Sequence, residues 1–170
     1  MLRFIGCVMI FVSCTSLGFL KASSYRARIA ELESVAELLK LLDMEITYRR
    51  DSLARAFCKV SEAKPCWFAG VLKDCSVMMA ERNSLVDSWN GALAKSMEEC
   101  PLNRQDIAIL QDLALGLGKS DIKGHRSIME PAMMRLGENL NDARRQEQKQ
   151  GKMYRGLGAA AGVVIAVILI

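Results

Sequence analysis

The chain has two apolar ends and a charged middle. No acidic or basic side chain occurs in residues 4–20 or in residues 156–170, and every charged residue except Arg3 lies between them. A helix needs about 20 apolar residues to cross a bilayer core of about 30 Å. Both segments approach that length, and flanking bases can extend them by snorkelling. The pattern therefore predicts one transmembrane helix at residues 1–20 and another at residues 156–170.

Two other interpretations of the N-terminal segment remain open. A cleaved secretory signal needs small residues before its cleavage site, and Leu17-Gly18-Phe19-Leu20 fits that requirement poorly. A lipoprotein signal would use Cys14, but Phe11 stands where an aliphatic residue is usual. Mature protein that starts at or after Cys14 would remove the N-terminal anchor.

The polar middle of the chain has the periodicity of α-helices and no extended strand-like alternation. In its first part, apolar residues recur at spacings of three and four, at Leu32, Val35, Leu39, Leu42 and Ile46. We expect the acidic residues of this helix, Glu31 among them, on its solvated face. Five shorter apolar-periodic segments follow, at Leu53–Val60, Trp67–Met79, Leu85–Met97, Ile107–Leu117 and Ile128–Leu140.

Capping residues separate these segments. Asp51-Ser52, Asn83-Ser84, Asn103 and Ser120-Asp121 are helix-start signals. Gly118 stands where a left-handed C-terminal cap is expected, and Pro131 predicts a kink in the last helix. Short turns favour antiparallel neighbours. The fold class is therefore all-α: a compact bundle of about six helices over residues 21–155, flanked by N- and C-terminal transmembrane helices.

The positive charges are concentrated beside the apolar ends. The net charge is +4, but residues 31–143 contain fourteen bases and eighteen acids. The excess lies at Lys21, Arg26 and Arg28 and again at Arg144, Arg145, Lys149, Lys152 and Arg155. Basic flanks tend to stay cytoplasmic, where anionic lipid attracts them. We therefore expect a cytoplasmic bundle in contact with membrane lipid. Without a basic face, nucleic-acid binding loses its main support.

The sequence favours a protein that is not an enzyme. It has no Walker A loop, nucleophile elbow, paired-histidine helix or dinucleotide fingerprint. His125 is the only histidine, and the cysteines form no C-x-x-C pair, so a zinc site is not expected. We expect His125 on the surface or at a helix cap and the scattered cysteines as buried thiols. Neither a cofactor nor a small-molecule substrate is expected.

The last apolar segment carries a stripe of small residues. Gly158 and Gly162 are four apart with alanines between them, which is the G-x-x-x-G pattern. Small residues let two membrane helices approach closely and gain packing contacts. The stripe predicts a helix contact, and changing both glycines to Ile should weaken assembly; ordinary small-residue usage in a membrane helix is the alternative.

Several short motifs occur in a characteristic order. The chain opens with Met1-Leu2-Arg3-Phe4-Ile5-Gly6, and its first polar helix holds Leu38-Leu39-Lys40-Leu41-Leu42-Asp43-Met44-Glu45-Ile46-Thr47-Tyr48. Leu117-Gly118-Lys119-Ser120-Asp121 comes later, and Lys152-Met153-Tyr154-Arg155-Gly156-Leu157-Gly158 leads into the last segment. With the two-anchor layout, these motifs resemble the stage III sporulation protein AB family of endospore-forming Firmicutes over essentially the whole chain.

Within those motifs, particular residues suggest structural roles. Gly118 would supply the positive φ that ends one helix, and Ser120 or Asp121 would cap the next. Glu45 and Tyr48 lie three apart on one helical face, where they could tether a neighbouring helix or a partner.

The resemblance implies a non-enzymatic part of the secretion-like complex that joins mother cell and forespore during sporulation, in the mother-cell membrane around the forespore. The family's helical domain is similar to platform protein F of type II secretion and type IV pilus systems. By that likeness, it would couple the cytoplasmic ATPase, stage III sporulation protein AA, to other channel subunits. A membrane-anchored adaptor or regulator unrelated to secretion is the alternative.

Overall fold

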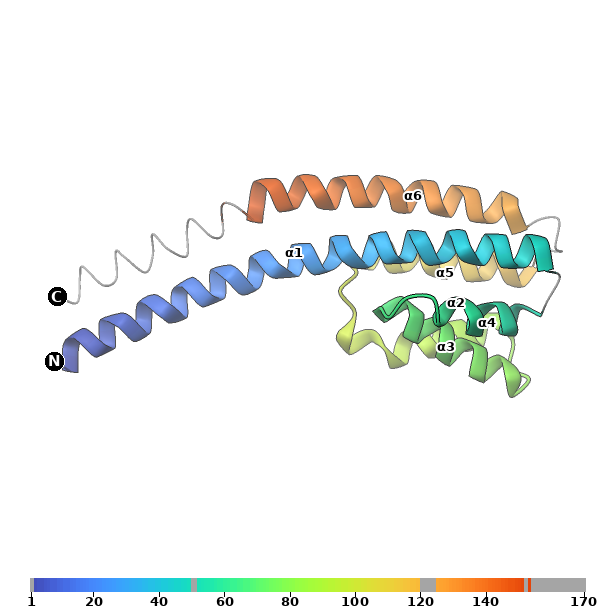
Figure 1. The fold of residues 1–170 in the computed structure, drawn as a ribbon, viewed down its shortest axis with the longest axis horizontal. Coiled ribbons are helices and arrows are strands. Elements are labelled where there is room, and N and C mark those ends of the chain that lie inside the picture. The colour runs from blue at the N-terminus through green and yellow to red at the C-terminus, as the bar shows by residue number, and fades with distance from the viewer. Residues whose placement is uncertain (1, 50–51, 120–124, 152, 154–170) are drawn as a thin grey trace. The chain divides into compact units, whose positions relative to one another are not determined.

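The computed structural model describes residues 2–49, 52–119, 125–151 and 153 (Figure 1). Within these ranges it contains helices and turns and no strand, so the all-helical prediction is confirmed. In that part of the chain, no helix is long and apolar enough to cross a membrane. The predicted span at residues 156–170 lies outside the described residues. Of the predicted span at residues 1–20, the structure describes the backbone from residue 2 onward and only the side chains of Ser13, Ser16 and Leu20.

Six α-helices occur in the described ranges, and the predicted number was about six. Their bounds, with those of one 3₁₀-helix (η1) and one π-helix (η2), are α1 Leu2–Arg49, α2 Leu53–Ser61, α3 Trp67–Ala80, α4 Leu85–Lys95, η1 Met97–Glu99, α5 Arg104–Lys119, α6 His125–Gln146 and η2 Glu147–Gly151. The predicted segments coincide with α1 to α6, except that Met97 belongs to η1. Helix α6 continues through Pro131 without interruption.

Two predicted caps form hydrogen bonds between side chain and backbone. Ser84 Oγ accepts the Asp87 N–H at 3.1 Å and donates to Asp87 Oδ2 at 2.6 Å. Asn103 Oδ1 accepts the Asp106 N–H at 2.8 Å, while Asp106 Oδ2 accepts the Asn103 N–H at 3.1 Å. This reciprocal capping box satisfies two backbone donors at the start of α5. Ser52 precedes α2 as predicted, although its side chain forms no capping bond.

The chain divides into two compact units, residues 30–140, here called the bundle, and residues 1–29 with 141–170, here called the terminal unit. In the bundle, α2, α3 and α4 gather on one side of α1, and α6 follows its other side (Figure 1). The predicted apolar stripe of α1 is buried there, at Leu32, Val35, Leu39, Leu42 and Ile46. The burial of this stripe confirms the helical period read from the sequence.

An aromatic cluster fills the core beneath α1. The Trp89 ring lies edge-on to Phe57, with centroids 5.6 Å apart, and to Phe68 at 5.9 Å. All three side chains are fully buried and come from three different helices. Edge-to-face pairs of this kind contribute about 0.5–1.5 kcal/mol each beyond the area that they bury. The cluster therefore fixes α2, α3 and α4 against one another.

The prediction that Glu31 is solvated is wrong. The residue is 8% exposed, and its Oε1 accepts the backbone N–H of Phe68 at 2.9 Å. Phe68 is in the first turn of α3, where backbone donors lack partners within the helix. The N-cap position itself holds Cys66, whose side chain makes no capping bond. Glu31 on α1 therefore caps α3, and this hydrogen bond explains why its carboxyl group is buried.

The left-handed cap predicted at Gly118 is also wrong. Among the described glycines none has a positive φ, and Gly118 lies inside α5. A Cβ placed on Gly118 would lie 3.1 Å from Val86 Cγ2 on α4. The small residue thus permits close approach of two helices. A left-handed residue does occur elsewhere, at Arg82, which has a φ of 68° in the turn between α3 and α4.

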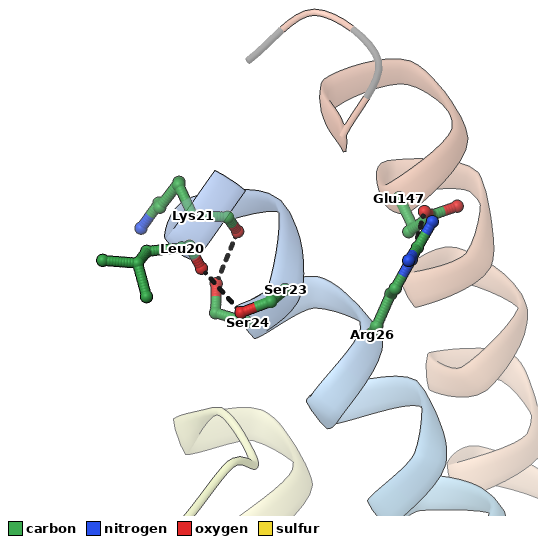
Figure 2. Close-up of polar contacts among 6 residues, drawn as sticks. All are labelled: Leu20, Lys21, Ser23, Ser24, Arg26 and Glu147. Carbon is green, nitrogen blue, oxygen red and sulfur yellow. Dashed lines mark hydrogen bonds and ion pairs between the residues drawn. The ribbon is translucent and has the colours of Figure 1, made fainter. Parts of the chain in front are cut away.

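In the terminal unit, polar side chains join the two chain segments that flank the apolar ends. Tyr25 Oη donates to Gln150 Oε1 at 2.5 Å, and Arg28 Nη1 donates to Gln146 Oε1 at 3.4 Å. Between them, Arg26 Nε forms an ion pair with Glu147 Oε1 at 3.3 Å (Figure 2). These three contacts bring together residues more than a hundred positions apart. They run antiparallel along α1 and the end of α6 with η2.

Candidate interaction surfaces

Glu45, one of the two predicted contact residues on α1, bonds within the bundle. Its Oε1 lies 2.6 Å from Lys59 Nζ on α2, and most of its side chain is shielded from solvent. The pair is charge-assisted and holds α2 against the end of α1. Glu45 therefore occupies the position of a helix tether, one of the two roles suggested by the sequence.

Tyr48 lies on the outer surface of the same helix, with other large apolar side chains. Leu41, Met44 and Tyr48 are 39%, 50% and 81% exposed. They are spaced by three and four residues, so they form one helical face. Thr47 and Asp43 line a hollow of about 200 Å³ beside Met44 and Tyr48. We call Leu41, Met44 and Tyr48 the α1 stripe; it presents a partner with an apolar surface that has a hydroxyl at one end.

A second apolar surface lies between α5 and α6. A shallow hollow of about 210 Å³ is lined by Ile109, Leu113, Ile128, Pro131 and Ala132, with Asp112 and Arg135 at its edge. Asp112 Oδ2 and Arg135 Nη1 are 3.9 Å apart, and both side chains are well exposed. Exposed pairs of this kind contribute little to stability. Met134 is exposed beside the hollow.

Of the other residues predicted to have contact or capping roles, the structure describes Gly118 alone. Gly118 packs toward α4, as described above. Ser120 and Asp121 lie outside the described residues, and so do Gly158 and Gly162. Their predicted roles as a helix cap and as a membrane-helix contact stay predictions.

The thiols and the single histidine differ from one another in their surroundings. Burial raises the pKa of the Cys75 thiol to about 12, and burial also raises the pKa values of Cys66 and Cys100. A raised pKa suppresses the thiolate, which is the reactive form. Cys58, in contrast, is exposed, so the prediction of uniformly buried thiols is wrong there. His125 is buried as the first residue of α6, so the surface, one of its two predicted positions, is wrong, while its place at a helix start is as expected.

Among the described residues, no group of three or more His, Cys, Asp or Glu side chains is placed to hold a metal ion.

Sequence reasoning missed two residues of the α1 stripe. Leu41 and Met44 appeared in the sequence analysis only as part of a family motif, and no contact role was predicted for them. Their position around the helix could have identified them, because neither residue belongs to the buried series Leu32, Val35, Leu39 and Leu42. An apolar residue outside the buried stripe of an amphipathic helix is a candidate for a contact surface.

Comparisons with known proteins agree with the observed fold. Residues 3–170 match the family model described as stage III sporulation protein AB. The stage III sporulation protein AB of Bacillus subtilis (strain 168) is 24% identical over 170 residues, covering 99% of each chain. A solved structure of stage III sporulation protein AB superimposes with a TM-score of 0.68 at 18% identity, covering 72% of this chain and 98% of that one. The chain belongs to the stage III sporulation protein AB family.

Proposed function

We propose that this protein is a membrane-anchored platform component of a sporulation channel complex, and that it couples a cytoplasmic ATPase to membrane subunits. The observation that carries the proposal is the α1 stripe. Three large apolar side chains are exposed on one face of α1, and the Glu45–Lys59 pair holds that helix to α2. Contiguous exposed apolar surface is typical of protein contacts. A rigid helix that presents such a face suits an assembly role.

Membrane anchoring is supported by the charge distribution along the sequence. Residues 4–20 and 156–170 carry no charged side chain, and basic residues follow the first segment and precede the second. In this proposal both ends cross the mother-cell membrane around the forespore and the bundle lies on its cytoplasmic side. The exposed Cys58 thiol reports this topology. An impermeant thiol reagent should label it only after the cells are opened, and labelling in intact cells would refute the cytoplasmic placement.

The partners proposed for the stripe are the stage III sporulation ATPase AA and other channel subunits. The test compares the proteins that co-purify from sporulating cells with the wild type and with two stripe variants, Met44→Glu and Tyr48→Glu. Val77→Glu is a matched control, because Val77 is an apolar residue that is 55% exposed and belongs to α3, a different helix from the stripe. The stripe variants should lose the ATPase or a channel subunit that both the wild type and Val77→Glu retain.

Two results would count against this assignment. Absence of the ATPase and of every channel subunit from the wild-type sample would refute the platform role. An unrelated set of captured proteins, lost in both stripe variants, would favour the alternative of a membrane-anchored adaptor unrelated to secretion. Equal loss in Val77→Glu would mean that added surface charge, and not the stripe, controls assembly.

A further inference from the structure

The terminal unit has a large surplus of positive charge. In its described residues it carries seven bases, namely Arg3, Lys21, Arg26, Arg28, Arg144, Arg145 and Lys149, and two acids, Asp142 and Glu147. Both acids already face an arginine, because Glu147 pairs with Arg26 at 3.3 Å and Asp142 lies 3.8 Å from Arg145. The described residues of the terminal unit therefore carry a net charge of +5, seven bases against two acids.

The fold gathers these bases from both flanks of the chain. The contacts Tyr25–Gln150, Arg26–Glu147 and Arg28–Gln146 hold residues 21–28 of α1 beside residues 144–150. Figure 2 shows Arg26 reaching across to Glu147 while Lys21 points away from that contact. Lys21, Arg145 and Lys149 are exposed. Thus Arg26 and Arg28 join the helices, whereas the side chains of Lys21, Arg145 and Lys149 are exposed to solvent.

In the sequence, these bases lie next to long uncharged, apolar segments on both flanks. Lys21 follows directly on Leu20, which is well exposed, and the uncharged residues 4–20. On the other flank, Met153 is exposed and the uncharged residues 156–170 follow within a few positions. Ser23 Oγ and Ser24 Oγ donate to the carbonyls of Leu20 and Lys21 at 3.0 Å and 2.8 Å, so these hydroxyls are bonded inside the helix (Figure 2). The bases thus lie at the border of two apolar segments.

We propose that the six bases Lys21, Arg26, Arg28, Arg144, Arg145 and Lys149, here called the basic collar, bind the phosphate headgroups of anionic phospholipids. The inference rests on the membrane anchoring in the proposed function, but not on the platform role or on the ATPase. An acidic protein partner offers the same charge. Lipid is the better match because the collar adjoins apolar chain on both helices, and only a headgroup places an anion directly beside a hydrocarbon phase.

The collar is tested with the full chain in a neutral detergent. Dioleoyl phosphatidylglycerol or dioleoyl phosphatidylcholine is titrated in, and the midpoint of thermal unfolding is followed by circular dichroism. The test variant is the triple Lys21→Gln, Arg145→Gln, Lys149→Gln, which spares Arg26 and Arg28. The control triple Lys40→Gln, Lys73→Gln, Arg104→Gln removes the same charge from exposed positions of the bundle. A triple with the bases exchanged, Lys21→Arg, Arg145→Lys and Lys149→Arg, keeps the charge.

Phosphatidylglycerol should stabilise the wild type at a lower lipid concentration than phosphatidylcholine. The test triple should need on the order of 10- to 100-fold more phosphatidylglycerol for half of the effect, because each base near an anionic surface contributes several-fold. Raising the salt concentration should shrink the difference. The control triple and the charge-preserving triple should behave as the wild type does.

Several outcomes would overturn the collar. One is equal stabilisation of the wild type by both lipids, and another is an equal loss of stabilisation in the two neutralised triples. A third is stabilisation by soluble glycerol phosphate or by a poly-glutamate peptide equal to that by phosphatidylglycerol, which would assign the site to free phosphate or to an acidic protein. Flotation with neutral phosphatidylcholine vesicles separates the two proposals. If the wild type floats with these vesicles but shows no preference for phosphatidylglycerol in the thermal titration, the collar alone is refuted. If the wild type does not float, the membrane anchoring is refuted and the collar with it.

Discussion

Asn139 on α6 donates a hydrogen bond from Nδ2 to Asp106 Oδ1 on α5 at 2.7 Å. The same carboxyl group accepts the backbone N–H of Asn103 through its other oxygen, and it is completely buried. One side chain therefore completes the cap of α5 and fixes α5 to α6. A buried carboxyl that serves two helices at once makes the position sensitive to the loss of either partner.

Replacing Asn139 by Ala should lower the free energy of unfolding by about 1–3 kcal/mol, because a buried acceptor loses a donor. Chemical denaturation of the full chain in mild detergent, followed by circular dichroism, measures the change. Asn141 lies two residues further along α6 and is exposed, so Asn141→Ala is the matched control and should change the value by less than about 0.5 kcal/mol. Equal effects would mean that the bond to Asp106 adds no stability.

Glu31 is expected to contribute mainly as a hydrogen-bond acceptor. Glu31→Ala leaves the Phe68 N–H buried without its cap and should cost about 1–2 kcal/mol of stability, while Glu31→Gln keeps an acceptor oxygen and should cost less. Glu37 on the same helix is the control. It pairs with Lys64 at 2.6 Å but is exposed, so Glu37→Ala should cost well under about 1 kcal/mol. A larger loss from Glu37→Ala would reverse this interpretation.

Local signals in the sequence predicted the helices well. Spacings of three and four residues and the capping residues before α4 and α5 depend on neighbours within one or two turns. Glu31 shows where such reasoning stops, since its partner is 37 residues away and only the folded chain brings them together. The Lys59 partner of Glu45 could not be predicted for the same reason.

Gly118 illustrates a second limit of prediction from sequence, because the missing side chain of glycine serves two different structural purposes. The absence of a Cβ permits a positive φ at a helix end, and it equally permits close packing between helices. The sequence places Gly118 near the end of α5 and cannot distinguish these uses. The 3.1 Å from its would-be Cβ to Val86 Cγ2 shows that packing is the use made here.

Arg82 should be replaceable by glycine with a gain in stability. Its φ of 68° crowds the Cβ of any L-residue, whereas glycine adopts this conformation freely. Arg82→Gly should raise the free energy of unfolding by about 0.5–1 kcal/mol. Glu81, the preceding residue, has a φ of −79°, so Glu81→Gly should instead lower stability by a similar amount. A loss of stability in Arg82→Gly would contradict the argument from strain.

Two helical glycines should respond oppositely to alanine. A Cβ on Gly116 would lie 2.6 Å from Ile128 Cγ2, whereas a Cβ on Gly137 would meet nothing within 4 Å. Gly116→Ala should cost about 1–3 kcal/mol through overpacking, and Gly137→Ala should gain about 0.5–1 kcal/mol from helix propensity. Denaturation curves of the two variants test the difference.

The Ile128→Ala background identifies the cause of the Gly116 effect. Removing the Ile128 methyl groups makes room for the new Cβ, so Gly116→Ala should cost little there, and the double-mutant cycle should give a coupling of about 1 kcal/mol or more. Strict additivity would show that the clash with Ile128 is not the origin of the loss.

Cys75 should make the protein less stable at alkaline pH. Burial raises the pKa of this thiol from its ordinary value of 9.0 to about 12, so between these values the unfolded chain releases a proton that the folded chain retains. The free energy of unfolding should therefore fall as pH rises through that window, by up to about 1.4 kcal/mol per pH unit. When denaturation near pH 8 is compared with denaturation near pH 10.5, the wild type should lose about 2 kcal/mol more of its free energy of unfolding than Cys75→Ala.

Val71→Ala is the control, because it changes a buried residue of the same helix that has no titrating group. It should lower stability at both pH values and leave the wild-type pH dependence in place. If Cys75→Ala has the wild-type slope, the alkaline loss comes from other groups and the thiol ionises as easily in the folded chain as in the unfolded one.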